Sequence, residues 1–362
     1  MSRLIVIAML LLSLVGAIGV HAQDTAPCTG DSCPVEVAAA DDQPHYGLSA
    51  DVIEAYTPPA FDQLTIDPNL LYDRRYARVS GALNVYDAPG GNLIRTQDAG
   101  FNFVTIMTQL DNGWTQINPG EWVETSKLAD SNDVISWFTG IFLTDPLPQY
   151  PVAWMLINAY PSDVPGGEPD ETRPLIYRYT RVNLFASRDV DGWTWYQIGP
   201  DTWVVQTAIA QILPVQRPDT VDTDRWVSVD LYEQVLIAYE GNTPVFATLV
   251  STGLPRWPTR EGTFHIYVRH VREDMTWGTP GDDYYLLEEV PWTMFFDEGR
   301  ALHGEYWHDG LGYRHSHGCV NISITDAHWL YLWVAQTFDG KLNSAQVEDG
   351  PAVYVYSSGV YK

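Results

Sequence analysis

Basic side chains are scarce in this sequence. Its 362 residues include 20 Lys and Arg against 46 Asp and Glu, which gives a formal net charge of −26 with histidine neutral. Such an acidic surface repels phosphate backbones, and no segment forms a basic stripe, so we expect no nucleic-acid partner. Aromatic residues are plentiful (14 Trp, 21 Tyr and 11 Phe) and provide ample material for packed cores.

Long hydrophobic runs are absent after the first 22 residues. Within these first 22 residues, Arg3 precedes an apolar run over residues 4–20, and residues 20–22 offer a cleavage site. This is the pattern of a secretory signal peptide over residues 1–22. A retained membrane anchor is the alternative, although the run is short for a full span and lacks a stop-transfer flank. We therefore expect an exported protein, secreted or associated with the cell envelope, with no transmembrane span after cleavage.

Cysteine is rare, with three residues in the chain. Cys28 and Cys33 flank the short segment Thr-Gly-Asp-Ser, so in an oxidising compartment we expect them to form a small disulfide. A lipid-modified Cys28 is the alternative. Two cysteines are too few for a structural zinc site. Cys319 is left without a sequence-local partner.

The length predicts two or three domains. Residues 23–75 are rich in Asp, Pro and Ala with weak periodicity, which indicates an unstructured leader or linker with one short helix near residues 50–56. From residue 76, short β-type runs alternate with Gly, Asn and Pro turns, which predicts a small antiparallel barrel over residues 76–130.

The same layout recurs over residues 150–213, before a polar, proline-containing linker at residues 214–224. The shared core is Gly-Trp, then Gln-Ile, then Trp-Val, which indicates a tandem duplication of one β module. Both copies resemble bacterial SH3 domains, and the second carries a long Pro/Gly/Glu-rich insertion. The matched residues are Gly113, Trp114, Gln116, Ile117, Trp122 and Val123 against Gly192, Trp193, Gln197, Ile198, Trp203 and Val204.

A third block covers residues 225–357 and is again mainly β. Its one convincing helix spans residues 325–334, with Thr325 or Asp326 as the cap. The expected fold is therefore mainly β: two small SH3-like barrels followed by a mostly β domain with one main helix.

Chemistry concentrates near the end of this block, where residues 316–321 read Ser-His-Gly-Cys-Val-Asn and His303 lies a little upstream. Thiolate is the reactive form of cysteine, and an imidazole with close backbone N–H groups suits a cysteine nucleophile. A buried structural Cys319 is the plain alternative, because free cysteine is commonly buried. A zinc site using His308 or His317 is disfavoured because the segment has no short ligand pair.

This block closely resembles the catalytic domain of L,D-transpeptidases, enzymes that cross-link bacterial peptidoglycan through a cysteine acyl-enzyme. The resemblance runs from residue 226 to about residue 356. It is carried by residues 251–253 (Ser-Thr-Gly), 258–266 (Pro-Thr-Arg-Glu-Gly-Thr-Phe-His-Ile), 292–296 (Trp-Thr-Met-Phe-Phe), 302–304 (Leu-His-Gly) and 316–321.

The resemblance implies a role for each matching residue. Cys319 is the nucleophile that forms a thioester, and His303 is the general base, oriented by the Gly304 carbonyl. Backbone N–H groups of Gly318 and Cys319 form the oxyanion hole. No metal or organic cofactor is implied. Further loop and substrate-binding roles fall to Ser316, His317, Asn321 and Met294.

An unperturbed imidazole titrates near ~6.5. We therefore expect acylation to rise with pH through the titration of the Cys319/His303 pair.

The implied function is peptidoglycan L,D-transpeptidation, part of cell-wall biogenesis and cell shape. Stem peptides and the sacculus are the expected partners, and carbapenems are expected inhibitors. An L,D-carboxypeptidase with the same residues is the alternative in enzyme chemistry. A non-catalytic wall-binding protein is the alternative from another class, but the residues that the chemistry needs are all present. The SH3-like modules would then bind the wall or space the catalytic domain.

Overall fold

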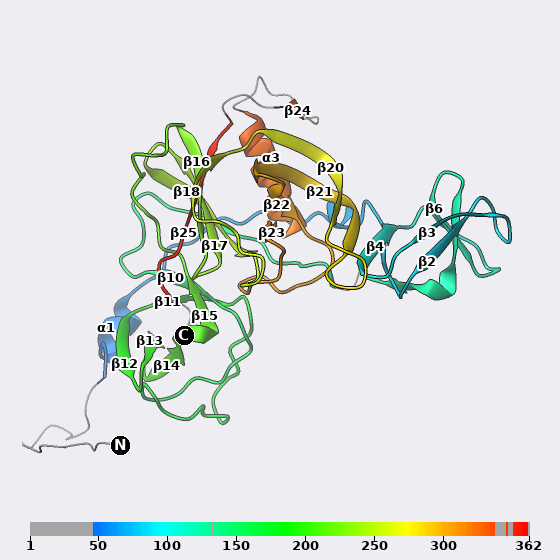
Figure 1. Cartoon of the computed structure of the whole chain (residues 1–362). Helices are drawn as coiled ribbons and strands as arrows, with labels where there is room; N and C mark the ends of the chain where they lie inside the picture. The colour runs from blue at the N-terminus through cyan, green and yellow to red at the C-terminus, as the bar shows by residue number, and fades with distance from the viewer. Residues whose placement is uncertain (1–45, 132–133, 337–344, 347–349, 361–362) are drawn as a thin grey trace, which may run out of the picture. The chain divides into compact units, whose positions relative to one another are not determined.

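The computed structural model of the chain describes residues 46–131, 134–336, 345–346 and 350–360. The predicted signal peptide and the predicted Cys28–Cys33 disulfide lie outside these residues. Strands dominate the described part (Figure 1). Within it, no helix is both long and apolar enough to cross a bilayer.

The C-terminal block contains most of a large mixed sheet, whose main path runs β19-β25-β16-β17-β18-β23-β22-β21-β4-β1-β8. Strands β16 to β18 read as nearly unbroken apolar runs because they are buried almost along their whole length. The strands of this block are β16 (Arg225–Asp230), β17 (Val235–Glu240), β18 (Thr243–Ser251), β19 (Gly262–His265), β20 (Val268–Trp277), β21 (Tyr285–Asp297), β22 (Arg300–Gly304), β23 (Val320–Ile322), β24 (Ala345–Gln346) and β25 (Ala352–Tyr356).

The predicted helix is α3 (Ile324–Ala335), which packs against β21 and β22. Its cap is Ser323, one position before the helix begins, and the Ser323 hydroxyl accepts a hydrogen bond from Asp326 N. The sequence placed the cap at Thr325 or Asp326, which are both helical and buried. Serine at the N-cap leaves Asp326 free to accept hydrogen bonds from Gly140 N and Thr248 Oγ1.

The first predicted module comprises β1 (Tyr76–Val79), β2 (Leu83–Tyr86), β3 (Leu93–Gln97), β4 (Phe101–Thr105), β5 (Thr108–Gln109), β6 (Trp114–Asn118), β7 (Glu121–Glu124), the 3-10 turn η1 (Thr125–Lys127) and β8 (Leu128–Asp130). Five strands form a separate sheet in the order β3-β2-β7-β6-β5. The other three continue the large sheet. Apolar residues from both sets share one small core, which includes Leu83, Val104, Ile117 and Val123.

The second predicted module has two three-stranded sheets, β11-β10-β15 and β12-β13-β14. In both modules an antiparallel hairpin is followed by a 3-10 turn and a short strand, so the repeat in the sequence is a repeat of structure. The elements are β10 (Val152–Met155), β11 (Arg181–Asn183), β12 (Ala186–Val190), β13 (Trp193–Gly199), β14 (Thr202–Val205), η3 (Gln206–Ala208) and β15 (Ile209–Gln211).

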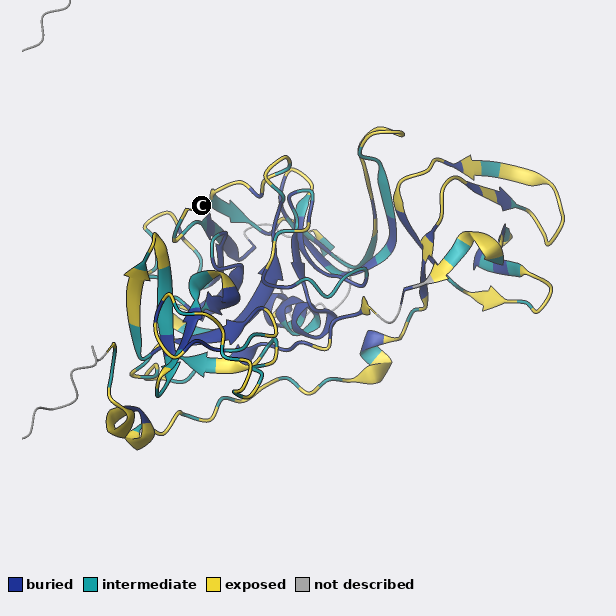
Figure 2. Cartoon of the chain, turned by 90° about the horizontal axis from the view of Figure 1, so that it is seen from below, coloured by how far each residue is buried: buried dark blue, intermediate teal, exposed yellow. Residues whose placement is uncertain are grey.

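The described part of the predicted leader, from residue 46, is not unstructured. It contains α1 (Ala50–Ala55), at the position of the predicted short helix, and α2 (Pro68–Leu71), joined by a largely exposed segment (Figure 2). Leu48 N donates to Gln197 Oε1 at 2.7 Å, and Leu71 is fully buried. Beyond the first module, β9 (Ile141–Phe142) pairs with β18. Weak periodicity therefore concealed a segment that is ordered by contacts with distant strands.

Candidate active site

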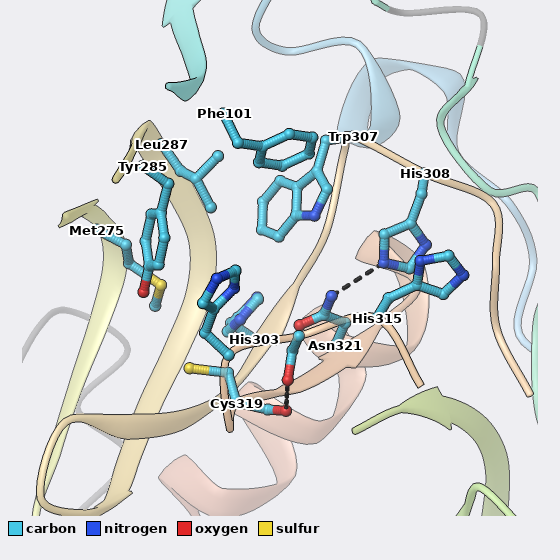
Figure 3. A pocket seen from close by; sticks show the side chains of 12 residues that line it. Phe101, Met275, Tyr285, Leu287, His303, Trp307, His308, His315, Cys319 and Asn321 are labelled. Carbon is cyan, nitrogen blue, oxygen red and sulfur yellow. Dashed lines mark hydrogen bonds between the residues drawn. The ribbon is translucent and has the colours of Figure 1, made fainter. Parts of the chain in front are cut away.

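Sheet register brings two of the predicted residues onto one face. Strands β22 and β23 are parallel neighbours, and His303 lies directly opposite Asn321. Cys319 directly precedes β23, so it lies next to this pair of residues. Together the three residues line one pocket of about 350 Å³ (Figure 3).

Apolar and aromatic side chains form much of this pocket, and a group of histidines forms another part. The long β20–β21 hairpin supplies Met275, Tyr285 and Leu287. The complete lining is Phe101, Met275, Tyr285, Leu287, His303, Trp307, His308, His315, Ser316, His317, Cys319 and Asn321. The pocket is therefore concave and mainly apolar with a few convergent polar groups, as ligand sites usually are.

The tautomer of His303 follows from its one ring contact. His303 Nδ1 lies 3.0 Å from the Gly304 carbonyl oxygen. A carbonyl oxygen only accepts, so Nδ1 carries the hydrogen and Nε2 keeps its lone pair. The residue is 1% exposed. This arrangement leaves Nε2 available to accept a proton from a neighbouring group.

Burial sets the protonation state of the pair. It lowers the pKa of His303 to about 4, although the Gly304 carbonyl opposes the shift. Burial also raises the pKa of the Cys319 thiol, while the Ala301 backbone and the Arg300 charge lower it less. At neutral pH the resting site is therefore a neutral thiol beside a neutral imidazole. We therefore expect the acylation rate to rise at a pH below the unperturbed imidazole pKa.

The loop before Cys319 is held by Ser316. The Ser316 hydroxyl donates to the Cys319 carbonyl oxygen at 2.5 Å and accepts from Gly318 N at 3.1 Å. Gly318 has φ +113°, which favours glycine, and a Cβ there would lie 2.8 Å from Arg300 Nε. Because its N–H is bonded to Ser316, Gly318 does not offer a free oxyanion donor in this structure.

His317 stands in an aromatic setting. Its ring stacks on Trp257 with centroids 3.9 Å apart, and Trp277 and Tyr285 lie within 5.8 Å and 5.1 Å of it. Burial lowers the pKa of His317, so the ring is neutral at pH 7. It holds the loop by ring packing.

His308, considered from the sequence only as a disfavoured zinc ligand, fixes the orientation of Asn321. Gly310 N donates to His308 Nδ1 at 2.9 Å, so in a neutral ring the hydrogen sits on Nε2. Burial lowers the pKa of His308 to about 3, which keeps the ring neutral. The Asn321 carboxamide meets Nε2 at 2.9 Å, and because Nε2 donates, the facing amide atom is the oxygen.

This assignment turns the Asn321 NH₂ away from His308. The NH₂ group then occupies the buried carboxamide position that has no hydrogen-bond partner among the described residues. Asn321 is 1% exposed and lines the pocket (Figure 3). An unsatisfied buried donor at a pocket wall is costly unless a ligand accepts from it.

Met294, expected to bind substrate, does not line the pocket. It lies opposite Leu302 on β22, on the face away from His303, and is fully buried in the main core. Met275 from β20 lines the pocket instead. The expectation was wrong because a one-residue difference in register moves a strand side chain to the other face.

A second pocket of about 430 Å³ also ends at Cys319. It shares Met275, Tyr285, His317 and Cys319 with the first pocket. Unlike the first, it is lined by four charged side chains, Arg256, Asp274, Glu298 and Arg300. Cys319 is thus reached from two spaces of different character.

Several lining residues carried no signal in the sequence. Phe101 and Trp307 lie outside residues 316–321, and His315 directly precedes them; only the tertiary fold brings Phe101 to this segment. In the described part of the chain, no three His, Cys, Asp or Glu side chains are grouped to hold a metal ion.

Residues 224–355 match the sequence model of the L,D-transpeptidase catalytic domain, YkuD. A curated relative, named "Putative L,D-transpeptidase YciB", of Bacillus subtilis (strain 168), is 26% identical over 129 residues. The match covers 32% of this chain and 63% of that protein, so the chain spans somewhat less than two thirds of the length of this relative.

Solved L,D-transpeptidases also show similarity to part of the chain. One from Stackebrandtia nassauensis is 25% identical with a TM-score of 0.28, covering 38% of this chain and 58% of the other. One from Enterococcus faecium, a C442S mutant in its own numbering, is 26% identical with a TM-score of 0.30, covering 37% and 50%. On the strength of the sequence match, residues 224–355 form an L,D-transpeptidase catalytic domain of the YkuD family.

Proposed function

We propose that the protein is a peptidoglycan L,D-transpeptidase that joins stem peptides through a thioester on Cys319. The observation that carries the proposal is the position of Cys319 where two pockets meet, one of which it lines together with His303. The Nδ1–H to Gly304 carbonyl bond leaves His303 Nε2 as the base. The enzyme acts outside the cytoplasmic membrane on the sacculus and is inhibited by carbapenems.

Acylation begins with a neutral thiol and a neutral imidazole. As Cys319 Sγ attacks the donor carbonyl, its proton passes to His303 Nε2, and a tetrahedral oxyanion forms. The Cys319 backbone N–H donates to that oxyanion. Collapse expels the C-terminal residue of the donor, whose amine takes the proton from the imidazolium. The product is a thioester with the base neutral again.

Deacylation repeats these steps with an acceptor amine. The amine attacks the thioester and passes a proton to His303 Nε2, and that proton returns to the departing sulfur. The result is a new peptide bond and a free thiol. The charged pocket suits this acceptor, because Asp274 and Glu298 attract an amine while Arg256 and Arg300 suit a carboxylate.

Two pockets at one thiol favour transfer over hydrolysis. Donor and acceptor can then both approach the thioester. An L,D-carboxypeptidase needs room for one peptide and a water only. The SH3-like assignment of the two repeated modules, and wall binding by them, form part of the proposal.

Product analysis tests this function. Incubation with a stem peptide and an amine-bearing acceptor stem should give cross-linked dimers, detected by liquid chromatography and mass spectrometry. Trimmed stems without dimers would instead assign an L,D-carboxypeptidase. Unchanged peptides under conditions where Cys319 is acylated by a carbapenem would contradict both activities.

The Asn321 amide yields a separate prediction. Asn321→Asp keeps the shape but replaces the NH₂ donor by an acceptor, so we expect kcat/KM for the stem peptide to fall about tenfold or more. In His308→Ala, kcat/KM for the stem peptide should also fall, because the Asn321 amide is no longer oriented. His265→Ala, a strand histidine bonded to Asp222 away from the pocket, is the matched control. Equal kcat/KM for Asn321→Asp and wild type would contradict the amide assignment.

A further inference from the structure

The first module is joined to the catalytic hairpin by a strand pairing. Strand β4 lies parallel to β21, with Phe101 opposite Tyr285 and Phe103 opposite Leu287. Both partners on β21 line the first pocket. The module therefore extends the catalytic sheet directly beside the strand that forms a pocket wall (Figure 1).

Backbone N–H groups of both strands donate hydrogen bonds across this pairing. Phe101 N donates to the Tyr284 carbonyl at 3.1 Å, and Leu286 N donates to Asn102 Oδ1 at 2.9 Å. Further along, Thr105 N donates to Glu288 Oε2 at 2.8 Å. Asn102 is fully buried, so its side-chain bond is shielded from competing water.

Close packing accompanies these bonds. A Cβ at Gly100 would lie 2.3 Å from the Tyr284 carbonyl oxygen, so the two backbones touch there. Tyr76 of β1 stacks on Tyr306 with ring centroids 3.5 Å apart and an interplanar angle of 5°. The same apolar cluster includes Met275 and is in contact with Cys319.

Phe101 completes the argument because it reaches the pocket itself. It lines the same cavity as His303 and Cys319, beside Leu287 and Trp307 (Figure 3). Its side chain is 38% exposed, so part of the ring is open to a ligand in this pocket.

We propose that the first module is a working part of the catalytic site. Phe101 contacts the donor stem peptide and sets its affinity, while β4 holds the β20–β21 hairpin in place. This inference rests on the proposed function, since it names a further substrate-contacting residue for that reaction. A module that only spaced the catalytic domain from its surroundings would have no side chain in the pocket.

Phe101→Ala tests the contact. We expect KM for the donor stem peptide to rise about tenfold while kcat changes little, because truncating an aromatic anchor removes binding contacts. Alkylation by iodoacetamide, a small probe of the thiol, should keep its wild-type rate. The matched control is Ile94→Ala, an exposed apolar residue of β3 outside the pocket, which should leave KM unchanged.

Gly100→Ala tests the strand pairing without altering a pocket residue. The added Cβ should push β4 from β21, so hydrogen exchange at the Leu286 amide should accelerate and KM should rise as for Phe101→Ala. Wild-type exchange and wild-type KM in Gly100→Ala would overturn the claim that β4 holds the hairpin.

Different results would overturn the proposed function and the inference about Phe101. A wild-type protein that processes no stem peptide overturns the proposed function. An active wild type with the same KM in Phe101→Ala overturns this inference alone. A lower melting temperature in Phe101→Ala together with an unchanged KM would assign Phe101 a structural role and also overturn it.

Discussion

His303→Ala is expected to slow acylation of Cys319 by roughly two to four orders of magnitude, the usual range for the loss of a general base. The structure gives the reason. His303 Nδ1 donates to the Gly304 carbonyl, which leaves Nε2 to accept the thiol proton. Because burial raises the thiol pKa, little thiolate forms without that base. The measurement is the second-order rate of carbapenem acylation, followed by stopped-flow absorbance.

The pH dependence of the same rate provides the control. In the wild type, His303 has a pKa lowered to about 4 and loses its function only when protonated, so acylation should rise through about pH 4 and then stay level to neutral pH. In His303→Ala the rate should follow thiolate formation and rise beyond about pH 8.5. A His303→Ala protein with the wild-type rate and profile would transfer the base role to His317.

Cys319→Ala is expected to abolish stem-peptide turnover altogether, the largest effect of any single change. No other nucleophile of comparable reactivity lines either pocket, and the thioester cannot form without sulfur. Cys319→Ser is the matched variant, since it retains shape but has a hydroxyl that the His303 base activates far less readily. Residual dimer formation by Cys319→Ala would place the nucleophile elsewhere.

The segment that contains Cys319 and the main helix could be recognised from the sequence because their signals are local. Residues 316–321 form one contiguous segment, and α3 shows a compact apolar run after a serine cap. The repeated hairpins were equally visible, since the Gly-Trp and Trp-Val pairs recur at matching positions. Local patterns determine such elements largely without help from distant residues.

Face assignments depended on register, which the sequence does not reveal. Met294 and Met275 are both methionines on β strands, yet Met294 lies opposite Leu302 and is buried in the core. Met275 lines the pocket. Similarly, the sequence did not reveal the contact between His308 and Asn321, which spans 13 positions along the chain.

The link between the first module and the hairpin was the least predictable feature. Residues 101–103 and 285–287 are far apart in the sequence, and parallel pairing between them requires no turn that a sequence would display. The role of Phe101 in the pocket follows only from that pairing. For the same reason, residues 23–75 were taken for an unstructured leader or linker, although Leu71 is fully buried.

The most direct test of the central claim is the mass of the intact protein after incubation with a carbapenem. The account predicts one adduct on the wild type, mapped by peptide analysis to Cys319, and none on Cys319→Ala. No adduct on the wild type, or an equal adduct on Cys319→Ala, would contradict a Cys319 acyl-enzyme.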